Sequence, residues 1–539
     1  MWLDDFFRSY YRHRPVNATF IGVHDYDDRL PDFSENGSGD LLAETESLLD
    51  GLRALPTEPA SEAEALDHKL VEGFLEIQRW ELVSKHFHRG NPCVYTGEAI
   101  FGVLALFLRE FAPLPERVES ATARLEAIPS FLARARANLR EAPPAWTERA
   151  IKECRGALAF LERGAPLLGV DSSPFTSSVE KAVVAFNDFQ RYLEGELKQR
   201  PSDDYACGAE VLDLLLRQGH FLDWNAAGIE AHAGDRLAHW EAVFAAKGGH
   251  PVLARLEDHH PLLEQYYSRY QEAWSAAREA ALAHDLVSWP EAPIRYLPQP
   301  HWAREAAPHL YFLSYRSPAP LDQLPVTDYL VTPIDQEMAA ETRYRLLRAH
   351  NDIVIKLNHV VHHGGLGHHL QNQFAYRALS RIGQIAAVDC ASRNALFCGG
   401  TMAEGWACYA TDLMDEIGFL TPLESLAEIH SRMRMAARAI VDVRLHQGFF
   451  DLDEAAAFYQ ERVGMTAEAA RSEAVKISMF PGTGLMYLMG CDLIHQLRRE
   501  LAAREGGAFS LRRFHDRFLS YGSVPVSLAA AAMRGSKPL

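Results

Sequence analysis

Cysteine is scarce in this 539-residue chain, and its seven cysteines form no recognisable pattern. They are scattered, odd in number and contain no Cys-x-x-Cys pair, which argues against a disulfide framework or a zinc knuckle and predicts reduced, mostly packed thiols. Long apolar runs are missing as well, because no stretch approaches the roughly 18 apolar residues of a membrane span. The first residues include Asp4 and Asp5, where a secretory signal would carry basic residues. We therefore expect a cytoplasmic protein with no membrane partner.

Positive charge is also in short supply. Lys and Arg number 54 against 72 Asp and Glu, which gives a formal net charge of −18. A nucleic acid or an anionic membrane would need a concentrated basic face, and the sequence has none. A composition of 48% hydrophobic and 23% charged residues is that of an ordinary globular protein. We therefore expect no nucleic-acid partner, and the pattern carries no signal for an oligomeric state.

Apolar residues at helical spacing run through most of the chain, with charged residues on the opposite faces. Proline-containing breaks separate the helices of an N-terminal helical region over residues 1–286. Helical spacing returns in residues 336–539. There the spacing predicts helices at 336–363, 368–381, 402–416, 423–447, 452–463, 466–476, 484–504 and 510–520.

Residues 287–335 separate these two regions and are rich in proline. They contain short β-prone pieces at 294–297, 310–315 and 329–332, which suit a small sheet with loops beside a cleft. The fold class is therefore predicted to be mainly α, a large multi-helix bundle with a small β element. We expect the three regions to form one continuous fold.

Histidine is concentrated in one short segment. Five of the 24 histidines fall within eleven residues, where composition alone would put roughly half a histidine. Imidazole is the commonest metal ligand and titrates near neutrality, so the cluster predicts a metal or proton-transfer site. Its members are His359, His362, His363, His368 and His369. We therefore expect residues 336–539 to be the helical region that binds a metal and carries the catalytic site.

Helix geometry limits which of these histidines can share a metal. On a regular helix His362 and His368 are separated by about 9 Å of rise, whereas two ligands on one tetrahedral zinc lie only about 3–3.5 Å apart. Three glycines between them supply a break, because glycine tolerates the unusual backbone that brings the next turn closer. His359 and His363, four residues apart, meet on one face without distortion and form a rival pair. Glu404, in a Glu-Gly-Trp context, is the best candidate for a third ligand from another helix.

These motifs resemble those of a known family, the bacterial domain-of-unknown-function 885 proteins, which look like zinc metallopeptidases of the gluzincin type. That family's pattern is His-Glu-x-x-Pro-Gly-His-His-Leu-Gln, followed by Glu-Gly-Trp-Ala-x-Tyr and Glu-x-Gly. The chain shows His-His-Gly-Gly-Leu-Gly-His-His-Leu-Gln at 362–371, Glu-Gly-Trp-Ala-Cys-Tyr at 404–409 and Glu-Ile-Gly at 416–418. Similar opening motifs at 18–22 and 29–32, and closing motifs at 481–487 and 521–525, extend the resemblance nearly end to end.

The resemblance implies a gluzincin-peptidase-like fold, with zinc as the metal and His362, His368 and Glu404 as its ligands. It also implies a small-molecule or short peptide-like substrate as the partner. It also exposes a departure, because the family's glutamate after the first histidine is His363 here and the family's proline is Leu366. In such peptidases that glutamate polarises the metal-bound water and takes its proton. Histidine can accept a proton but differs in length and charge state, which puts ordinary peptidase activity in question.

A second group of candidates lies on one stripe of a predicted helix. Arg438, Asp442 and His446 are four residues apart, and the family shows a similar spacing. His446 could donate a proton or stabilise an oxyanion, Asp442 could orient it and Arg438 could bind a substrate carboxylate. A solvated ion-pair stripe is the alternative. Tyr487 follows a Pro-Gly-x-Gly turn, and its phenol could stabilise an oxyanion or bond to backbone.

Three functions compete on this basis. The first is a metal-dependent hydrolase, in which zinc-bound water attacks an amide-like or related small substrate and His363 or His446 handles protons. The second is a non-hydrolytic metalloenzyme, a lyase, an isomerase or an oxidative enzyme using iron or manganese, since the glutamate base is missing and imidazole is in excess. The third is a lapsed enzyme that acts as a binding protein. The motif set favours the hydrolase.

Overall fold

Helices make up most of the chain in the computed structural model, which describes residues 2–56, 59, 61–203, 205–310, 317–391 and 393–535. Many helices begin at a Ser, Thr, Asn or Asp whose side-chain oxygen accepts a hydrogen bond from a backbone N–H of the first turn, as Asn91 does. Thr421 and Asp451 form complete capping boxes with the glutamates three residues later. Local sequence therefore sets where these helices start.

The first 286 residues form the succession of helices that the apolar spacing predicts, with α6 packed along α8 and α5 along α7. Their bounds are α1 Trp2–His13, α2 Pro15–Ile21, α3 Glu35–Arg53, α4 Glu62–Val83, α5 Pro92–Leu104, α6 Leu114–Asn138, α7 Pro144–Ala159, α8 Ser173–Gly195, α9 Ala209–Leu214, α10 Ala226–Ala246, α11 Gly249–Leu253 and α12 Tyr266–Ala283.

The rest of the chain is also helical, with a two-stranded sheet, so the mainly α fold class is confirmed. The helices are α13 His301–Arg304, α14 Ala340–Ala349, α15 His368–Ala375, α16 Arg381–Ile385, α17 Gly400–Glu416, α18 Pro422–His446, α19 Leu452–Val463, α20 Ala467–Met479, α21 Met486–Glu505, α22 Leu511–Leu519 and α23 Val526–Gly535. Short π segments are η1 Phe160–Gly164, η4 Leu215–Gly219 and η7 Val354–Gly364, and short 3-10 segments are η2 Ala165–Leu168, η3 Leu197–Gln199, η5 Ala254–Asp258, η6 Leu263–Gln265, η8 Phe397–Gly399 and η9 Gly506–Ala508.

The single helix expected over 336–363 is wrong, because the segment forms two elements. After α14 ends, the side-chain oxygen of Asn351 accepts hydrogen bonds from the backbone N–H groups of Ile353 (3.1 Å) and Val354 (3.0 Å). This cap starts a new helical segment, η7, which winds as a π-helix. Apolar spacing runs across the cap and hides the boundary.

The sheet consists of β1 (Ile294–Pro298) and β2 (Thr327–Val331), which pair in parallel. Two of the three predicted β-prone pieces, 294–297 and 329–332, therefore fall on strands, the second with a shifted start. The third, 310–315, lies outside the described residues except for Leu310, which is in a turn. Helix α12 packs against both β1 and η7. It therefore lies in contact with both the sheet and the histidine segment.

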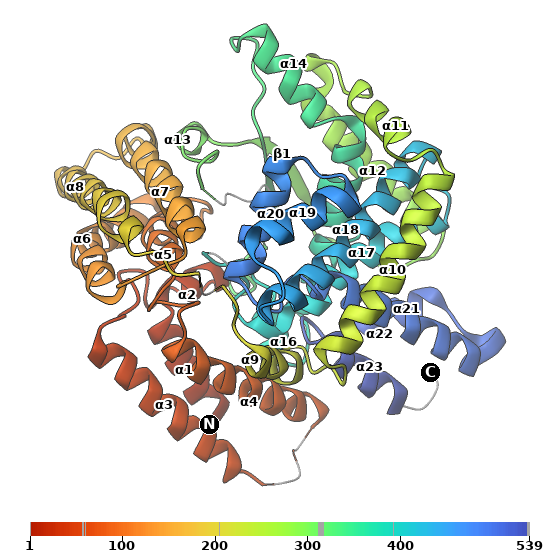
Figure 1. Ribbon diagram of the computed structural model, residues 1–539, viewed down its shortest axis with the longest axis horizontal. Helices are drawn as coiled ribbons and strands as arrows, with labels where there is room; N and C mark the ends of the chain where they lie inside the picture. Colours follow the sequence, from red (N-terminus) through yellow and green to blue (C-terminus); the bar gives the residue numbers. More distant parts are fainter. Residues whose placement is uncertain are drawn as a thin grey trace.

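The helices gather into two groups in space. Figure 1 shows α1–α8 on one side, and α10 with most of the later helices on the other. Helix α10 packs along α18, and α17 along α21. One core of buried apolar residues nevertheless runs from Phe6 to Met533. Among the described residues, none of the helices is both long and apolar enough to cross a membrane.

Candidate metal centre

A cavity of about 650 Å³ lies between the two groups of helices. On one side its walls carry side chains from α2, α4 and α5, including Asn17 and Glu98. On the other side the walls come from η7, α15, α17, α18 and α21. A concave site of this size is where a small ligand is expected to bind.

The histidine segment reaches the cavity through a sharp break after η7. The backbone N–H of Gly367 donates to the carbonyl of Val361 at 2.9 Å, and a Cβ on Gly367 would lie only 1.9 Å from the carbonyl oxygen of His362. This close approach admits only glycine. The indole of Trp406 donates to the carbonyl of Leu366 at 2.8 Å and fixes the turn against α17. The break that the glycines predicted is therefore present.

The break brings His362 and His368 to the same carboxylate. Their Nε2 atoms each lie 3.5 Å from Oε2 of Glu404, and their ring centroids are 4.9 Å apart. Nitrogen and oxygen atoms about 3–3.5 Å apart have the spacing of ligands around one tetrahedral ion. The three residues predicted as metal ligands thus converge on one point in the cavity wall.

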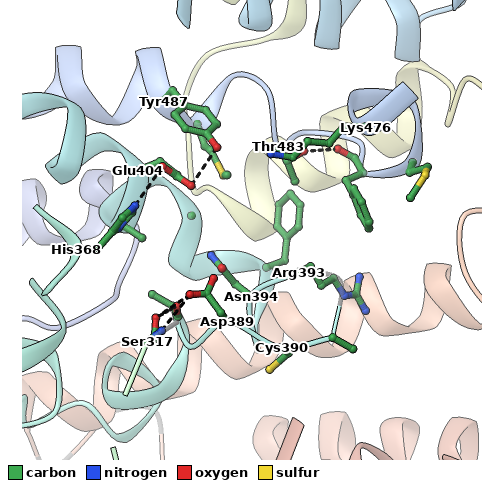
Figure 2. A pocket seen from close by; sticks show the side chains of 18 of the residues that line it. Ser317, His368, Asp389, Cys390, Arg393, Asn394, Glu404, Lys476, Thr483 and Tyr487 are labelled. Carbon is green, nitrogen blue, oxygen red and sulfur yellow. Dashed lines mark hydrogen bonds and ion pairs between the residues drawn. The ribbon is translucent and has the colours of Figure 1, made fainter. Parts of the chain in front are cut away.

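Glu404 owes its position to a tight contact between α17 and α21. A Cβ on Gly405 would lie 2.6 Å from the backbone of Gly490, and a Cβ on Gly490 would lie 2.2 Å from the carbonyl oxygen of Thr401. Because α17 and α21 approach so closely, Glu404 on α17 and Tyr487 on α21 come within hydrogen-bond distance. The hydroxyl of Tyr487 donates to Oε1 of Glu404 at 3.0 Å, as Figure 2 shows.

His363 lies in the same cluster. One ring nitrogen of His363 and one each of His362 and His368 all lie within 4.8 Å of one another. Nδ1 of His363 is 2.7 Å from the backbone carbonyl oxygen of Asn358. Since a carbonyl only accepts, Nδ1 carries the proton in this contact and the lone pair of the neutral ring is on Nε2. His363 is therefore prepared either to bind a cation or to accept a proton.

The rival pair is split. His359 is buried, and its Nδ1 lies 2.6 Å from the hydroxyl of Tyr329 on β2, away from the residues that line the cavity. His363 points into the cavity, so the two rings do not share a ligand site. His369 is also buried, with Nε2 2.9 Å from the carbonyl of Ala292.

Burial and mutual contact set the charges of the cluster. Burial disfavours ionisation of Glu404, but contacts with His362 and His368 outweigh it and hold the pKa of the carboxyl well below its usual value. Burial lowers the pKa of His362, and burial with two neighbouring imidazoles lowers the pKa of His363 well below its usual value. For His368, contact with Glu404 outweighs burial and raises the pKa. An ionised carboxylate and neutral imidazoles are the forms that bind a metal, so the shifts of Glu404 and His362 favour binding, and a metal would have to displace the proton that Glu404 favours on His368.

The stripe on α18 differs from its predicted role. His446 is fully buried, lies 3.0 Å from the carbonyl oxygen of Ile477 and does not line the cavity. Asp442 accepts hydrogen bonds from the backbone N–H groups of Gly482, Gly484 and Leu485, and burial raises its pKa to about 7. Asp442 thus anchors the turn before α21, and its Oδ1 also lies 3.6 Å from Nε2 of His446. The predicted proton transfer by His446 at the metal has no support in this geometry, because His446 does not reach the cavity.

Arg438 does reach the cavity. Its Nε donates to Oε1 of Glu473 at 2.5 Å, and its guanidinium stacks 4.6 Å from the ring centroid of Tyr487. Glu473 thus neutralises the positive charge of Arg438 that was expected to bind a substrate carboxylate. Arg438 therefore supports Tyr487 from behind.

Sequence reasoning missed several polar residues of the cavity. Arg434 lies one turn before Arg438 on the same stripe of α18, so the helical spacing held a signal for it. Asp389 accepts hydrogen bonds from the backbone N–H and the hydroxyl of Ser317, both at 3.1 Å. Figure 2 shows this pair across the cavity from Glu404. Asp389 and Ser317 are 72 residues apart and follow no periodic pattern, so no local signal was present.

A second group of ligand-type side chains lies between α17 and α21, outside the cavity. Asp412 Oδ2 is 2.7 Å from Nε2 of His495 and 3.5 Å from Sγ of Cys491. Nε of Arg432 also donates to Asp412, at 2.7 Å. Because Arg432 already neutralises the carboxylate, this group is better suited to joining helices than to holding a cation.

Comparisons with known proteins agree with the fold. The family described as bacterial protein of unknown function (DUF885) matches residues 15–533. A "putative lipoprotein of unknown function" from Shewanella oneidensis has a similar structure, with a TM-score of 0.76, 22% identity and coverage of 99% of this chain and 98% of that one. A "putative lipoprotein" from Colwellia psychrerythraea has a TM-score of 0.78, 17% identity and coverage of 99% and 97%. No curated protein matches. The cytoplasmic location stays a prediction.

Proposed function

The chain belongs to the DUF885 family of bacterial proteins of unknown function, and we propose that it is a metal-dependent hydrolase acting on a small amide-like substrate. The observation that carries the proposal is the convergence of two imidazoles on one carboxylate oxygen in a cavity wall, with 3.5 Å between each Nε2 and Oε2 of Glu404. Two histidines and one glutamate form a donor set typical of catalytic zinc, which keeps its fourth position for water or substrate.

In this proposal His362, His368 and Glu404 hold zinc. The bound zinc would supply a water activated for attack and would polarise the substrate carbonyl. Tyr487 donates to Glu404 Oε1 at 3.0 Å, and its single O–H can turn from Glu404 to donate to the oxyanion that develops on a substrate carbonyl. Arg438 holds the Tyr487 ring from behind.

His363 takes the role of the proton acceptor. The contact of Nδ1 with the Asn358 carbonyl keeps that nitrogen protonated and leaves Nε2 as the basic atom. In sequence His363 stands where the peptidase pattern has its glutamate. The imidazole can take the proton from the attacking water and return it to the leaving nitrogen.

One observation favours a second candidate, a non-hydrolytic metalloenzyme with iron or manganese. Histidines that bind metals usually donate their other ring N–H to a carbonyl or carboxylate, and His363 does so to Asn358. If His363 were a fourth metal ligand beside His362, His368 and Glu404, it could not also accept the proton. No base would then stand where the peptidase pattern has its glutamate. Such a nitrogen-rich site suits iron or manganese as well as zinc.

Elemental analysis of the purified full-length protein tests the proposal. We expect about one zinc per chain, loss of that metal in His362→Ala, and unchanged metal in His284→Ala, which alters an exposed histidine at the end of α12. The variant His363→Glu should gain activity on a panel of amide substrates if His363 is the base. Stoichiometric iron with oxygen-dependent turnover would favour the second candidate.

The remaining outcome concerns a lapsed enzyme that only binds its ligand. Protein without stoichiometric metal, together with a His362→Ala variant that keeps every measured activity, would contradict a metal-dependent hydrolase. Binding of a small molecule without metal would then support the binding protein.

A further inference from the structure

Two arginines one turn apart on α18 face the cavity, and only one of them has an anionic partner. Arg438 pairs with Glu473. Within the part of the chain that the structure describes, Arg434 forms no ion pair and donates no hydrogen bond, although it lines the cavity. The guanidinium carries five N–H donors, so Arg434 presents a large unused binding capacity to the cavity.

The surroundings of Arg434 place it at the metal centre. Its charge acts on His362, and Tyr487 and Cys408 act on it in turn. Burial lowers the pKa of Arg434, and repulsion by Arg438 lowers it further. The carboxylate of Glu473 opposes both effects, but it already pairs with Arg438. A buried guanidinium without an ion-pair partner of its own destabilises the folded chain, so this position gains from an anion that comes from outside.

Four of the acidic groups of the cavity wall are already engaged. Glu404 is shared by two histidines and Tyr487. Across the cavity, Glu81 pairs with Arg14 and Arg393, and Asp389 binds Ser317. Glu428 accepts a hydrogen bond from Thr411 at 3.0 Å. Among these described acids none pairs with Arg434, which stays accessible from the cavity.

We propose that Arg434 binds the carboxylate of the substrate, which makes the substrate an amide that bears a carboxylate close to the bond that is cleaved. N-acylated amino acids and short peptides with a free carboxyl end belong to this class. The proposal rests on the proposed hydrolase function for the amide and on Arg434 for the carboxylate. Arginine binds carboxylates through two parallel N–H···O bonds, which would also orient the substrate.

The reaction needs only water as a co-reactant. The oxygen of water forms a bond to the acyl carbon and the C–N bond breaks. One proton of the water ends on the leaving nitrogen, and the products are a carboxylic acid and an amine. The carboxylate on Arg434 is unchanged, so Arg434 acts in binding and orientation. A cavity of about 650 Å³ is within the usual range for small ligands, which is about 300–1,000 Å³.

The test compares two probes that differ only in charge, benzoylglycine and its uncharged carboxamide, benzoylglycinamide. Binding to the purified metal-loaded protein is measured by isothermal titration, and hydrolysis by release of the amine. Arg434→Gln is expected to weaken benzoylglycine binding by about 30-fold or more, the lower end of the loss when a buried hydrogen-bonded charge loses its partner. Binding of benzoylglycinamide should stay unchanged.

Two variants serve as controls. Arg444→Gln removes another α18 arginine, which pairs with Glu230 outside the cavity, and should leave both affinities unchanged. Arg434→Lys keeps the charge without the planar fork and should retain part of the preference for benzoylglycine. Since Arg434 forms no ion pair or hydrogen bond in the described protein and its buried charge is destabilising, the melting temperature of Arg434→Gln should equal or exceed that of the wild-type protein. A melting temperature that does not fall separates lost binding from lost folding.

The outcomes distinguish this proposal from the hydrolase proposal. Preference for benzoylglycine that disappears in Arg434→Gln, without hydrolysis of either probe, would support the carboxylate site and count against the hydrolase. Hydrolysis with equal affinity for both probes, or no binding of benzoylglycine, would overturn the carboxylate site. An equal loss of turnover on both probes in Arg434→Gln would also overturn it, because Arg434 would then stabilise the oxyanion.

Discussion

At the scale of single residues, Tyr487 connects the proposed metal ligand Glu404 with Arg438 on α18. Its hydroxyl donates to Glu404, and its ring rests on the guanidinium of Arg438, which is itself neutralised by Glu473. The phenol is therefore held in place from two directions. With the ring fixed before substrate arrives, only the single O–H must turn from Glu404 to reach a developing oxyanion.

Tyr487→Phe removes only the hydroxyl. We expect kcat to fall by about 10²–10³-fold, the usual effect of losing one oxyanion donor, with KM and melting temperature nearly unchanged. Steady-state kinetics on a substrate found in the amide panel measures this change. Tyr11→Phe is the matched control, because Tyr11 does not line the cavity. A kcat equal to that of the wild-type protein would show that the hydroxyl has no part in the reaction.

The residues of the candidate site were easiest to predict where they lie together in a short sequence motif. His362, His368 and Glu404 lie in compact motifs with a glycine break, and the structure brings their side chains together. Helical spacing gave a poorer answer on α18, because a stripe of residues four apart gradually turns away from the cavity. Arg434 and Arg438 line the cavity, whereas His446 is buried outside it.

At the scale of elements, the break between η7 and α15 determines whether a metal centre can exist. A regular helix would separate His362 from His368 by about 9 Å of rise, whereas the break brings both Nε2 atoms to one oxygen. The sequence predicted this break from its glycines. It did not predict the π-helix, because the Asn351 cap and the shift in hydrogen bonding leave the apolar pattern unchanged.

Gly367→Ala tests the break directly. A Cβ at Gly367 would lie 1.9 Å from the carbonyl oxygen of His362, so the turn must open and the two histidines must separate. We expect loss of stoichiometric metal and a decrease of about 1–3 kcal/mol in the free energy of unfolding, as for other overpacked sites. Elemental analysis and urea denaturation measure the two effects.

Gly507→Ala is the matched control for this substitution, because a Cβ at Gly507 would meet no atom within 4 Å. It should keep the metal and the stability of the wild-type protein. If Gly367→Ala bound metal as the wild-type protein does, the tight turn would not be needed for the centre.

At the scale of the whole molecule, the cavity is formed by segments that are far apart in sequence. Its walls combine Asn17 and Glu98 with His362 and Tyr487. No periodic pattern in a single chain shows that α2 and α5 will face η7 and α21, because such contacts depend on how the two groups of helices meet. The helices could therefore be predicted one by one, while the cavity between them could not.

A charged cluster joins distant parts of the chain outside the cavity wall. His24, after α2, contacts Asp27 through Nδ1 at 2.7 Å and Asp322 through Nε2 at 2.8 Å. Arg109 lies 3.6 Å from Asp322, and Arg124 lies 3.7 Å from Asp27. The ring of His24 also stacks on a phenylalanine. Two carboxylates on one imidazole favour its charged form, even with two arginines nearby.

This cluster predicts a loss of stability at alkaline pH. Burial of His24 disfavours its charge, but the hydrogen bonds with Asp27 and Asp322 outweigh burial and raise its pKa from 6.5 to about 9. A raised pKa means that the folded state binds the proton more tightly than the unfolded state. The contribution is therefore complete below pH 6.5 and is lost as the pH rises through about 9.

Urea denaturation of wild-type protein and His24→Gln at several pH values between 6 and 10 measures this contribution. After allowance for partial exposure of the ring, we expect on the order of 2 kcal/mol. The wild-type protein should be more stable than His24→Gln at pH 6, and the difference should shrink steadily toward pH 10 because the proton that stabilises the cluster is lost. A difference that stays constant over this range would mean that His24 joins the two segments by packing alone, without its charge.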